Sequence, residues 1–146
     1  CDGILVHGRA DRIDRTEAGL GIVDYKTGKA PTDRQVAEGF ALQLGLLAFI
    51  AEQGGFEGVQ GDADVFEYWS FQRDGGKPGK ISSPAGKGGN KTPPDVFVET
   101  MVIKFKEAAA KWLSGREPFT AKLNPDYARS DYDHLMRLEE WQGRDA

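Results

Sequence analysis

The sequence predicts a mixed α/β domain in which a β-sheet is flanked by helices. Three observations lead to this fold class: a pair of closely spaced β-like runs near the start, a helical apolar pattern directly after them, and a third β-like run followed by a second helical pattern. A length of 146 residues suits one domain, so residues 1–146 are expected to share a single core.

The first two β-like runs are expected to form an antiparallel hairpin. Residues 4–13 read ILVHGRADRI and residues 20–26 read LGIVDYK, and both are rich in apolar and β-branched residues. The segment RTEAG between them is short and polar and contains a glycine, as a hairpin turn requires. A third strand is expected over residues 63–72, where VFEYWSF carries aromatic and β-branched side chains.

Helices are expected before and after the third strand. The first covers residues 33–53, where Thr32 or Asp33 can cap the start and Gly54 follows the end. The second begins at its cap, Asp95, and ends at Gly115, and a short third helix follows residue 130. The residues that share a face are Val36, Phe40, Gln43, Leu47 and Ile50 in the first helix, and Phe97, Met101, Phe105, Ala108 and Trp112 in the second.

Composition and charge exclude several classes of protein. Apolar residues make up 39% and charged residues 29%, a globular balance, and residues 73–94 are rich enough in glycine, proline and lysine to predict a flexible loop. The net charge of −4 argues against a protein that coats nucleic acid through bulk charge. No membrane-spanning run or signal peptide is recognised, so a cytoplasmic protein is expected. The abrupt start suggests a C-terminal fragment of a longer polypeptide.

Two carboxylates and a lysine are expected to meet at one end of the hairpin. Side chains alternate along a strand, so Asp24 and Lys26 share a face. The hairpin can place Asp11 across from Asp24. Such a group suits Mg²⁺, which is held by one or two carboxylates and activates water for phosphodiester hydrolysis, with a fixed lysine as a further cation. The commoner explanation of an Asp-x-Lys triplet is a surface ion pair.

The stretches GRADRID, IVDYKTGK and EGFALQLGLLAF resemble, in this order, the core of the PD-(D/E)xK nuclease superfamily, and specifically its RecB-like nuclease domains. Gly8 and Asp11 match a Gly-x-x-Asp strand, Asp24 to Lys26 match the Asp-x-Lys strand, and Gln43 opens the helical Gln-x-x-x-Tyr motif. The resemblance implies a restriction-endonuclease-like sheet. It also implies a metal-dependent deoxyribonuclease with Asp11, Asp24, Lys26 and Gln43 as catalytic residues. Mg²⁺ or Mn²⁺ would be bound by Asp11, Asp24 and the main-chain carbonyl of Tyr25.

Within that superfamily the chain most resembles nuclease domains of the AddB type, which belong to ATP-dependent helicase–nucleases of double-strand break repair. This implies an exonuclease acting on DNA ends or single strands with a helicase partner, AddA. Leu47 stands where the motif has tyrosine, an upstream helix with a further ligand is missing, and Cys1 alone cannot hold an iron–sulfur cluster. The alternatives are a catalytically incomplete DNA-binding or structural module, and a hydrolase of small phosphate esters.

Other polar and aromatic residues have competing explanations. Gln43 lies on an apolar stripe and is expected to be anchored at the site. Asp14 has the wrong strand parity for the site and is expected to pair with an arginine, while His7 and Glu38 are expected to have structural and surface roles. Trp69 and Phe71 are expected in the core rather than stacked on bases. The residues that could contact phosphates are Lys29, Arg34, Lys77, Lys80, Lys87 and Lys91.

Overall fold

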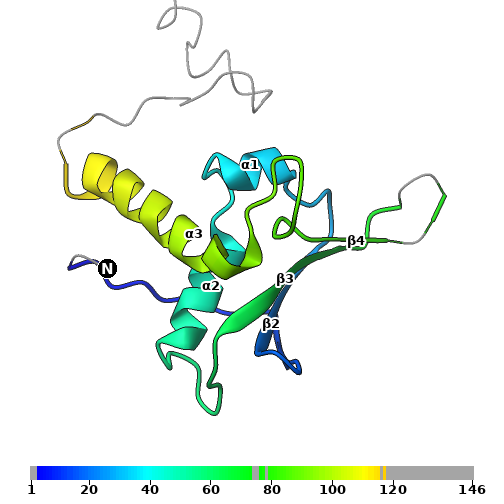
Figure 1. Ribbon diagram of the computed structural model, residues 1–146. Helices are drawn as coiled ribbons and strands as arrows, with labels where there is room; N and C mark the ends of the chain where they lie inside the picture. Colours follow the sequence, from blue (N-terminus) through cyan, green and yellow to red (C-terminus); the bar gives the residue numbers. More distant parts are fainter. Residues whose placement is uncertain (1–2, 74–75, 78, 116, 118–146) are drawn as a thin grey trace, which may run out of the picture. The chain divides into compact units, whose positions relative to one another are not determined.

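The structure is a computed structural model that describes residues 3–73, 76–77, 79–115 and 117 (Figure 1). The chain divides into two units, Cys1–Ala108 and Ala109–Ala146. The first contains a β-sheet and three α-helices, and the described part of the second contains a π-helical turn over Ala109–Leu113. The short helix predicted after residue 130 lies outside the described residues. No helix in the described part is long and apolar enough to span a membrane.

The sheet has four strands in the order β1 (Arg12–Arg15), β2 (Leu20–Lys26), β3 (Ala63–Ser70) and β4 (Lys80–Ser82). β1 and β2 are antiparallel, β2 and β3 are parallel, and β3 and β4 are antiparallel. The parallel pair needs a long connection, which α1 and α2 supply (Figure 1). The predicted mixed sheet and the predicted hairpin are both confirmed.

The first strand is shorter than the sequence suggests. Residues 4–11 are not in a strand, and β1 contains only Arg12–Arg15. A Cβ atom at Gly8 would lie 3.0 Å from Leu47 and 3.5 Å from Ile50, and Ala10 packs against the core. This stretch therefore lies against α2 instead of forming a ladder.

The predicted helix over residues 33–53 is in fact two helices, α1 (Asp33–Ala37) and α2 (Gln43–Glu52). Thr32 caps α1 in a capping box with Gln35. Gly39 then adopts a φ of +88°, a left-handed conformation that ends the helix and that side chains other than glycine disfavour. Because of this break, Gln43 becomes the first residue of α2 rather than a residue in the middle of a helix.

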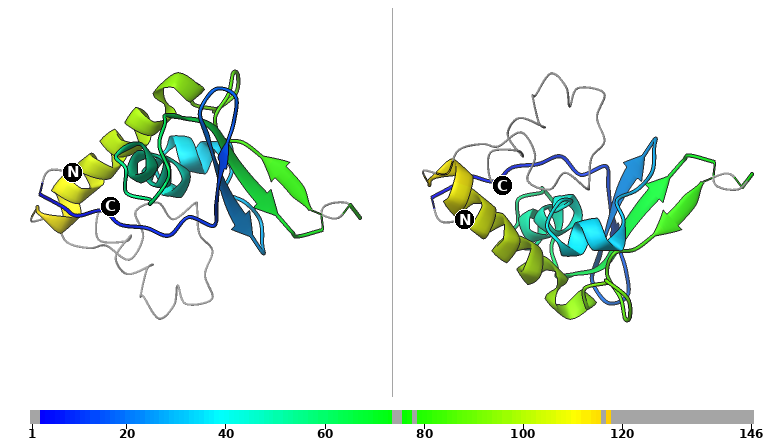
Figure 2. Two further views of the ribbon diagram at one scale, coloured as in Figure 1. Left: turned by 90° about the horizontal axis from the view of Figure 1, so that it is seen from below. Right: turned by 90° about the horizontal axis from the view of Figure 1, so that it is seen from above.

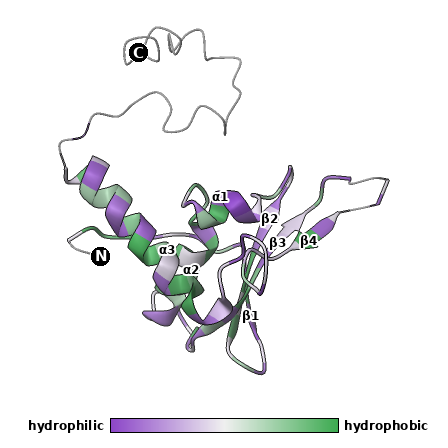
Figure 3. Cartoon of the chain, turned by 45° about the horizontal axis from the view of Figure 1, so that its top comes forward, coloured by the Kyte–Doolittle hydropathy of each residue, from purple (hydrophilic) through white to green (hydrophobic). Residues whose placement is uncertain are grey.

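The core lies between the sheet and two helices, α2 and α3 (Pro94–Ala108). Both helices cover the same side of the sheet, which we call the inner face, and the opposite side is the outer face (Figure 2). The Phe66 and Phe97 rings have centroids 4.3 Å apart, and a Cβ at Gly45 would collide with Met101, so α2 and α3 pack closely. Figure 3 shows hydrophobic residues where these elements meet.

The segment 73–94 contains a strand that the sequence interpretation missed. β4 pairs with β3 through Tyr68↔Ser82, Trp69↔Ile81 and Ser70↔Lys80. Farther along the segment, an isolated bridge joins Ala85 to Thr92. β4 has only three residues, too few to be recognised in a segment whose composition is rich in glycine and proline.

Candidate active site

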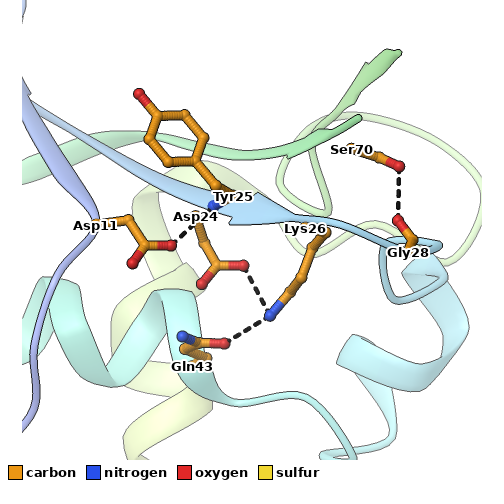
Figure 4. Close-up of polar contacts among 7 residues, drawn as sticks. All are labelled: Asp11, Asp24, Tyr25, Lys26, Gly28, Gln43 and Ser70. Atoms are coloured by element: carbon orange, nitrogen blue, oxygen red, sulfur yellow. Dashed lines mark hydrogen bonds and ion pairs between the residues drawn. The ribbon is translucent and has the colours of Figure 1, made fainter. Parts of the chain in front are cut away.

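The carboxyl end of β2 carries an acid and an amine on the inner face. Asp24 follows buried Ile22 on the same side of the strand and is only 2% exposed. Lys26 Nζ lies 2.8 Å from Asp24 Oδ2 (Figure 4). The predicted alignment of Asp24 and Lys26 on one face is therefore correct.

The hairpin brings Asp11 to the same end of β2. Arg12 pairs with Val23, so the preceding residue lies across from Asp24. The main-chain N–H of Tyr25 donates a hydrogen bond of 2.9 Å to Asp11 Oδ2. Figure 4 shows the Asp11 and Asp24 carboxylates at this end of β2. Although Asp11 lies just outside β1, its carboxylate has the position that strand parity predicts.

Gln43 links the helix to the strand. Lys26 Nζ donates a hydrogen bond of 2.9 Å to Gln43 Oε1 (Figure 4). The lysine is thus held between an amide oxygen and the Asp24 carboxylate. One turn further along α2, Leu47 is buried in the core. We call Asp11, Asp24, Lys26 and Gln43 the acidic corner.

One oxygen of Asp24 has unused capacity to accept a hydrogen bond. Asp24 Oδ2 is buried and accepts no hydrogen bond from the described residues, because Lys26 approaches it as an ion pair outside hydrogen-bond alignment. Most buried carboxylate oxygens do have such partners. A buried anionic oxygen of this kind is suited to a cation.

Tyr68 is a neighbour of the acidic corner that the sequence interpretation missed. It pairs with Asp24 in the β2–β3 register, and Lys26 Nζ lies 5.7 Å from its ring centroid. Its hydroxyl is buried without a hydrogen-bond partner in the described residues. Burial, and then the nearby Asp24 charge, raise the pKa of the Tyr68 hydroxyl. Its period-two alternation with Phe66 was the available signal for an inward position.

Three other polar residues that were considered as candidates for the site lie outside the acidic corner. Asp14 pairs with Arg12 at 2.8 Å, which confirms the predicted salt bridge. Glu38 pairs with Arg34 at 2.7 Å on the surface of α1, as expected. His7 is exposed on the irregular segment before β1.

The prediction that the aromatic residues Trp69 and Phe71 lie in the core is wrong for Phe71. Phe71 was expected in the core but is 62% exposed, and Trp69 is partly buried. Their rings have centroids 5.6 Å and 5.9 Å, respectively, from that of Tyr25, and the Arg12 guanidinium lies 5.0 Å from the Trp69 ring centroid. The reason is strand parity: these residues point away from α2 and α3, so their cluster lies on the opposite side of the sheet from the acidic corner.

The predicted phosphate-contacting residues divide into two groups. Lys29, Lys80 and Lys91 line one cavity near the end of β2, together with Arg73, which the sequence interpretation did not single out. The others, Arg34, Lys77 and Lys87, are exposed and do not line that cavity.

Comparison with protein families identifies the family to which the chain belongs. The family model of the PD-(D/E)XK nuclease superfamily matches residues 2–129. The chain belongs to the PD-(D/E)XK nuclease superfamily. Members of this superfamily are typically metal-dependent nucleases, and the mixed sheet with its helices agrees with their restriction-endonuclease-like fold. Searches of curated proteins and of solved structures gave no match.

The residues of this PD-(D/E)XK chain fit a divalent cation of the kind that the superfamily uses. The buried, underused oxygen of Asp24 and the adjacent Asp11 carboxylate are hard oxygen donors. The described residues contain no group of three or more histidine, cysteine, aspartate or glutamate side chains suited to a metal. Such a donor set suits a hard divalent cation that keeps several waters beside one or two carboxylates.

Proposed function

We propose that the acidic corner hydrolyses phosphodiester bonds of DNA with Mg²⁺ or Mn²⁺. The observation that carries the proposal is the buried Asp24 carboxylate, whose Oδ2 lies 2.8 Å from Lys26 Nζ but accepts no hydrogen bond from the described part of the chain. A buried carboxylate needs a compensating cation. A lysine that is itself 28% exposed gives only part of that compensation while remaining accessible to a substrate.

Each residue of the acidic corner has a distinct proposed role. Asp11 and Asp24 would hold the cation, together with the main-chain carbonyl of Tyr25. When bound, the cation would lower the pKa of a coordinated water and neutralise charge on the phosphate. Lys26 would place a fixed positive charge beside the attacking water or the phosphate, where exclusion of solvent strengthens its effect. Gln43 would keep the Lys26 ammonium in that position through their hydrogen bond of 2.9 Å.

The wider role that we propose rests on the sequence resemblance alone. The chain would be the exonuclease domain of an AddB-type protein, acting in the cytoplasm on DNA ends or single strands. A helicase partner of the AddA type would supply the strand during double-strand break repair. No iron–sulfur cluster is expected to involve the lone Cys1.

A second candidate is a nuclease fold that binds DNA without cutting it. The absence of a third metal-suited side chain among the described residues favours it, as does the apolar Leu47 on α2. Such a module would bind DNA equally well with or without Lys26, and no cleavage would depend on that residue.

The test is cleavage of end-labelled single-stranded DNA in Mn²⁺ by the wild type, Lys26→Ala and Lys87→Ala. Lys87 is an exposed lysine that lies neither in the acidic corner nor in the cavity lined by Lys29, Lys80 and Lys91. We expect Lys26→Ala to lose about 10²-fold to 10³-fold in rate, as when one stabilising group is removed from an active site. Lys87→Ala should keep the wild-type rate. Equal cleavage by Lys26→Ala and the wild type would exclude the mechanism, and cleavage of a nitrophenyl phosphate ester but not of DNA would indicate a small-ester hydrolase.

A further inference from the structure

A cavity of about 630 Å³, which we call the basic cavity, lies beside the loop that follows β2. Its walls come from three parts of the chain: the loop from Lys29 to Asp33, the end of β3 with the residues that follow it, and β4 with its following loop. The lining residues used below are Lys29, Ser70, Arg73, Lys80 and Lys91.

The charge of the cavity is opposite to that of the chain. Among the described residues, four cationic side chains and one acid, Asp33, line the cavity, whereas the whole chain has a net charge of −4. Thr32, Ser82 and Ser83 add hydroxyl groups to a lining that also includes Ala30, Pro31, Gln72 and Ile81. Clustered cations beside hydroxyl donors are the groups that typically contact backbone phosphates.

The cavity continues the inner face beyond the acidic corner. Lys26 pairs with Ser70, and Ser70 pairs with Lys80, so the three residues form a row across the sheet on one face. Neighbouring strands lie about 4.8 Å apart, which puts the Lys80 backbone roughly 10 Å from that of Lys26. That span corresponds to the axial rise of about three nucleotides of one strand in a B-form duplex.

Hydrogen bonds hold the cavity walls in place. Ser70 Oγ donates to the Gly28 carbonyl at 2.7 Å, which fixes the loop that carries Lys29 to the end of β3. Thr92 N–H donates to the Pro84 carbonyl at 3.2 Å, so the loop carrying Lys91 folds back next to β4. Lys29 and Lys91 therefore lie on loops whose main chain is anchored, and Lys80 lies on strand β4.

We propose that this basic cavity binds the backbone phosphates of a single DNA strand whose scissile bond lies at the acidic corner. The inference rests on the proposed function and extends it to the path of the substrate. The strand would leave the acidic corner along the row from Lys26 to Lys80, with its neighbouring phosphates between Lys29, Lys80 and Lys91. Because these contacts are made to phosphates, they favour substrates longer than a dinucleotide without selecting a base sequence.

The test measures binding of a labelled single-stranded oligonucleotide to the full chain in EDTA, where no cleavage occurs. The double variant Lys80→Ala/Lys91→Ala removes two cavity cations. The matched control, Lys77→Ala/Lys87→Ala, removes two exposed lysines from the same segment that do not line the cavity. We expect the cavity double variant to bind at least about tenfold more weakly. The slope of the logarithm of the association constant against the logarithm of the salt concentration should become shallower by about 1.4, because each phosphate contact with a single strand contributes about 0.7. The control should change neither value.

Additional variants separate a binding defect from a folding defect. Lys80→Arg/Lys91→Arg keeps the charges and should retain affinity. Lys29→Ala, from a different wall, should weaken binding by itself. Equal losses in the cavity and control doubles would overturn the proposal, as would competition by inorganic phosphate at the affinity of the oligonucleotide, which would indicate a small-anion site.

The outcomes also separate this inference from the proposed function. A cavity-dependent loss of binding in a protein that cleaves no DNA would support the cavity and contradict the nuclease activity. Cleavage that depends on Lys26 but is the same in both double variants, on long and short substrates, would support the nuclease and contradict the cavity.

Discussion

Two ion pairs on neighbouring strands differ in burial but not in distance. Arg12 and Asp14 on β1 are two residues apart, and so are Asp24 and Lys26 on β2, and each pair has a nitrogen and an oxygen 2.8 Å apart. The side chains of the first pair are 42% and 39% exposed. In the second pair Lys26 is 28% exposed and Asp24 only 2%.

The difference shows that spacing alone does not make a site. The Arg12–Asp14 pair lies on the outer face, where water screens its charges and such pairs contribute little to stability. The Asp24–Lys26 pair lies on the inner face beside the core, where an unpaired charge is costly and a bound cation is correspondingly favoured. Three predictions test this contrast, in descending order of expected effect.

Removal of each cation should affect stability very differently. Lys26→Met leaves the buried Asp24 carboxylate without a cation, so the free energy of unfolding without metal should fall by about 3 kcal/mol. This is the low end of the range for a broken buried pair, because Lys26 is partly exposed. Arg12→Met should leave the urea midpoint almost unchanged. Urea unfolding in EDTA measures both, and equal midpoints for the two variants would contradict the contrast.

Loss of the Gln43 contact should slow cleavage without weakening substrate binding. Gln43→Ala frees the Lys26 ammonium, so kcat should fall about tenfold, equivalent to about 1.4 kcal/mol, while KM stays constant. Gln43→Glu keeps an acceptor and should restore most of the rate. Gln53→Ala, at the other end of α2, is the control and should behave as wild type. A change in KM alone would assign Gln43 to substrate binding.

Removal of the Tyr68 hydroxyl should have the smallest effect. The hydroxyl is buried and has no hydrogen-bond partner among the residues that the structure describes, so Tyr68→Phe should raise the free energy of unfolding by up to about 1 kcal/mol. Burial raises the pKa of Tyr68 above its usual 10.0, so ionisation of this hydroxyl leaves the stability of the wild type unchanged below pH 10.0 and lowers it as the pH rises from there through the raised pKa. Tyr68→Phe should therefore lose less stability than wild type above pH 10.0. A destabilised variant would mean that the hydroxyl has a partner.

The sequence predicted the parts of the site that depend on alternation along strands. Asp24 and Lys26 share the inner face, Asp11 lies across from Asp24, and Asp14 pairs with an arginine. Period-two patterning carries this information because one face of the sheet is buried.

The features that the sequence did not predict depend on tertiary packing or on single backbone torsions. Gly39 splits the predicted helix through its positive φ, and residues 4–11 lie outside the sheet, where Gly8 passes close to Leu47 and Ile50 of α2. Phe71 is exposed because no described helix covers the outer face. The gathering of Lys29, Arg73, Lys80 and Lys91 around one cavity depends on the pairing of β4 with β3, which their spacing does not reveal.

Calorimetric titration of Mn²⁺ into wild type, Asp24→Asn and Asp14→Asn tests the central claim most directly. Both substitutions remove one carboxylate charge from an acid–base pair of the same spacing, and circular dichroism checks that each variant is folded. We predict saturable binding by wild type and Asp14→Asn, and affinity reduced by at least about tenfold, roughly 1.4 kcal/mol, in Asp24→Asn. Wild-type affinity in Asp24→Asn, or equal losses in both variants, would contradict the assignment of the cation to the buried carboxylate.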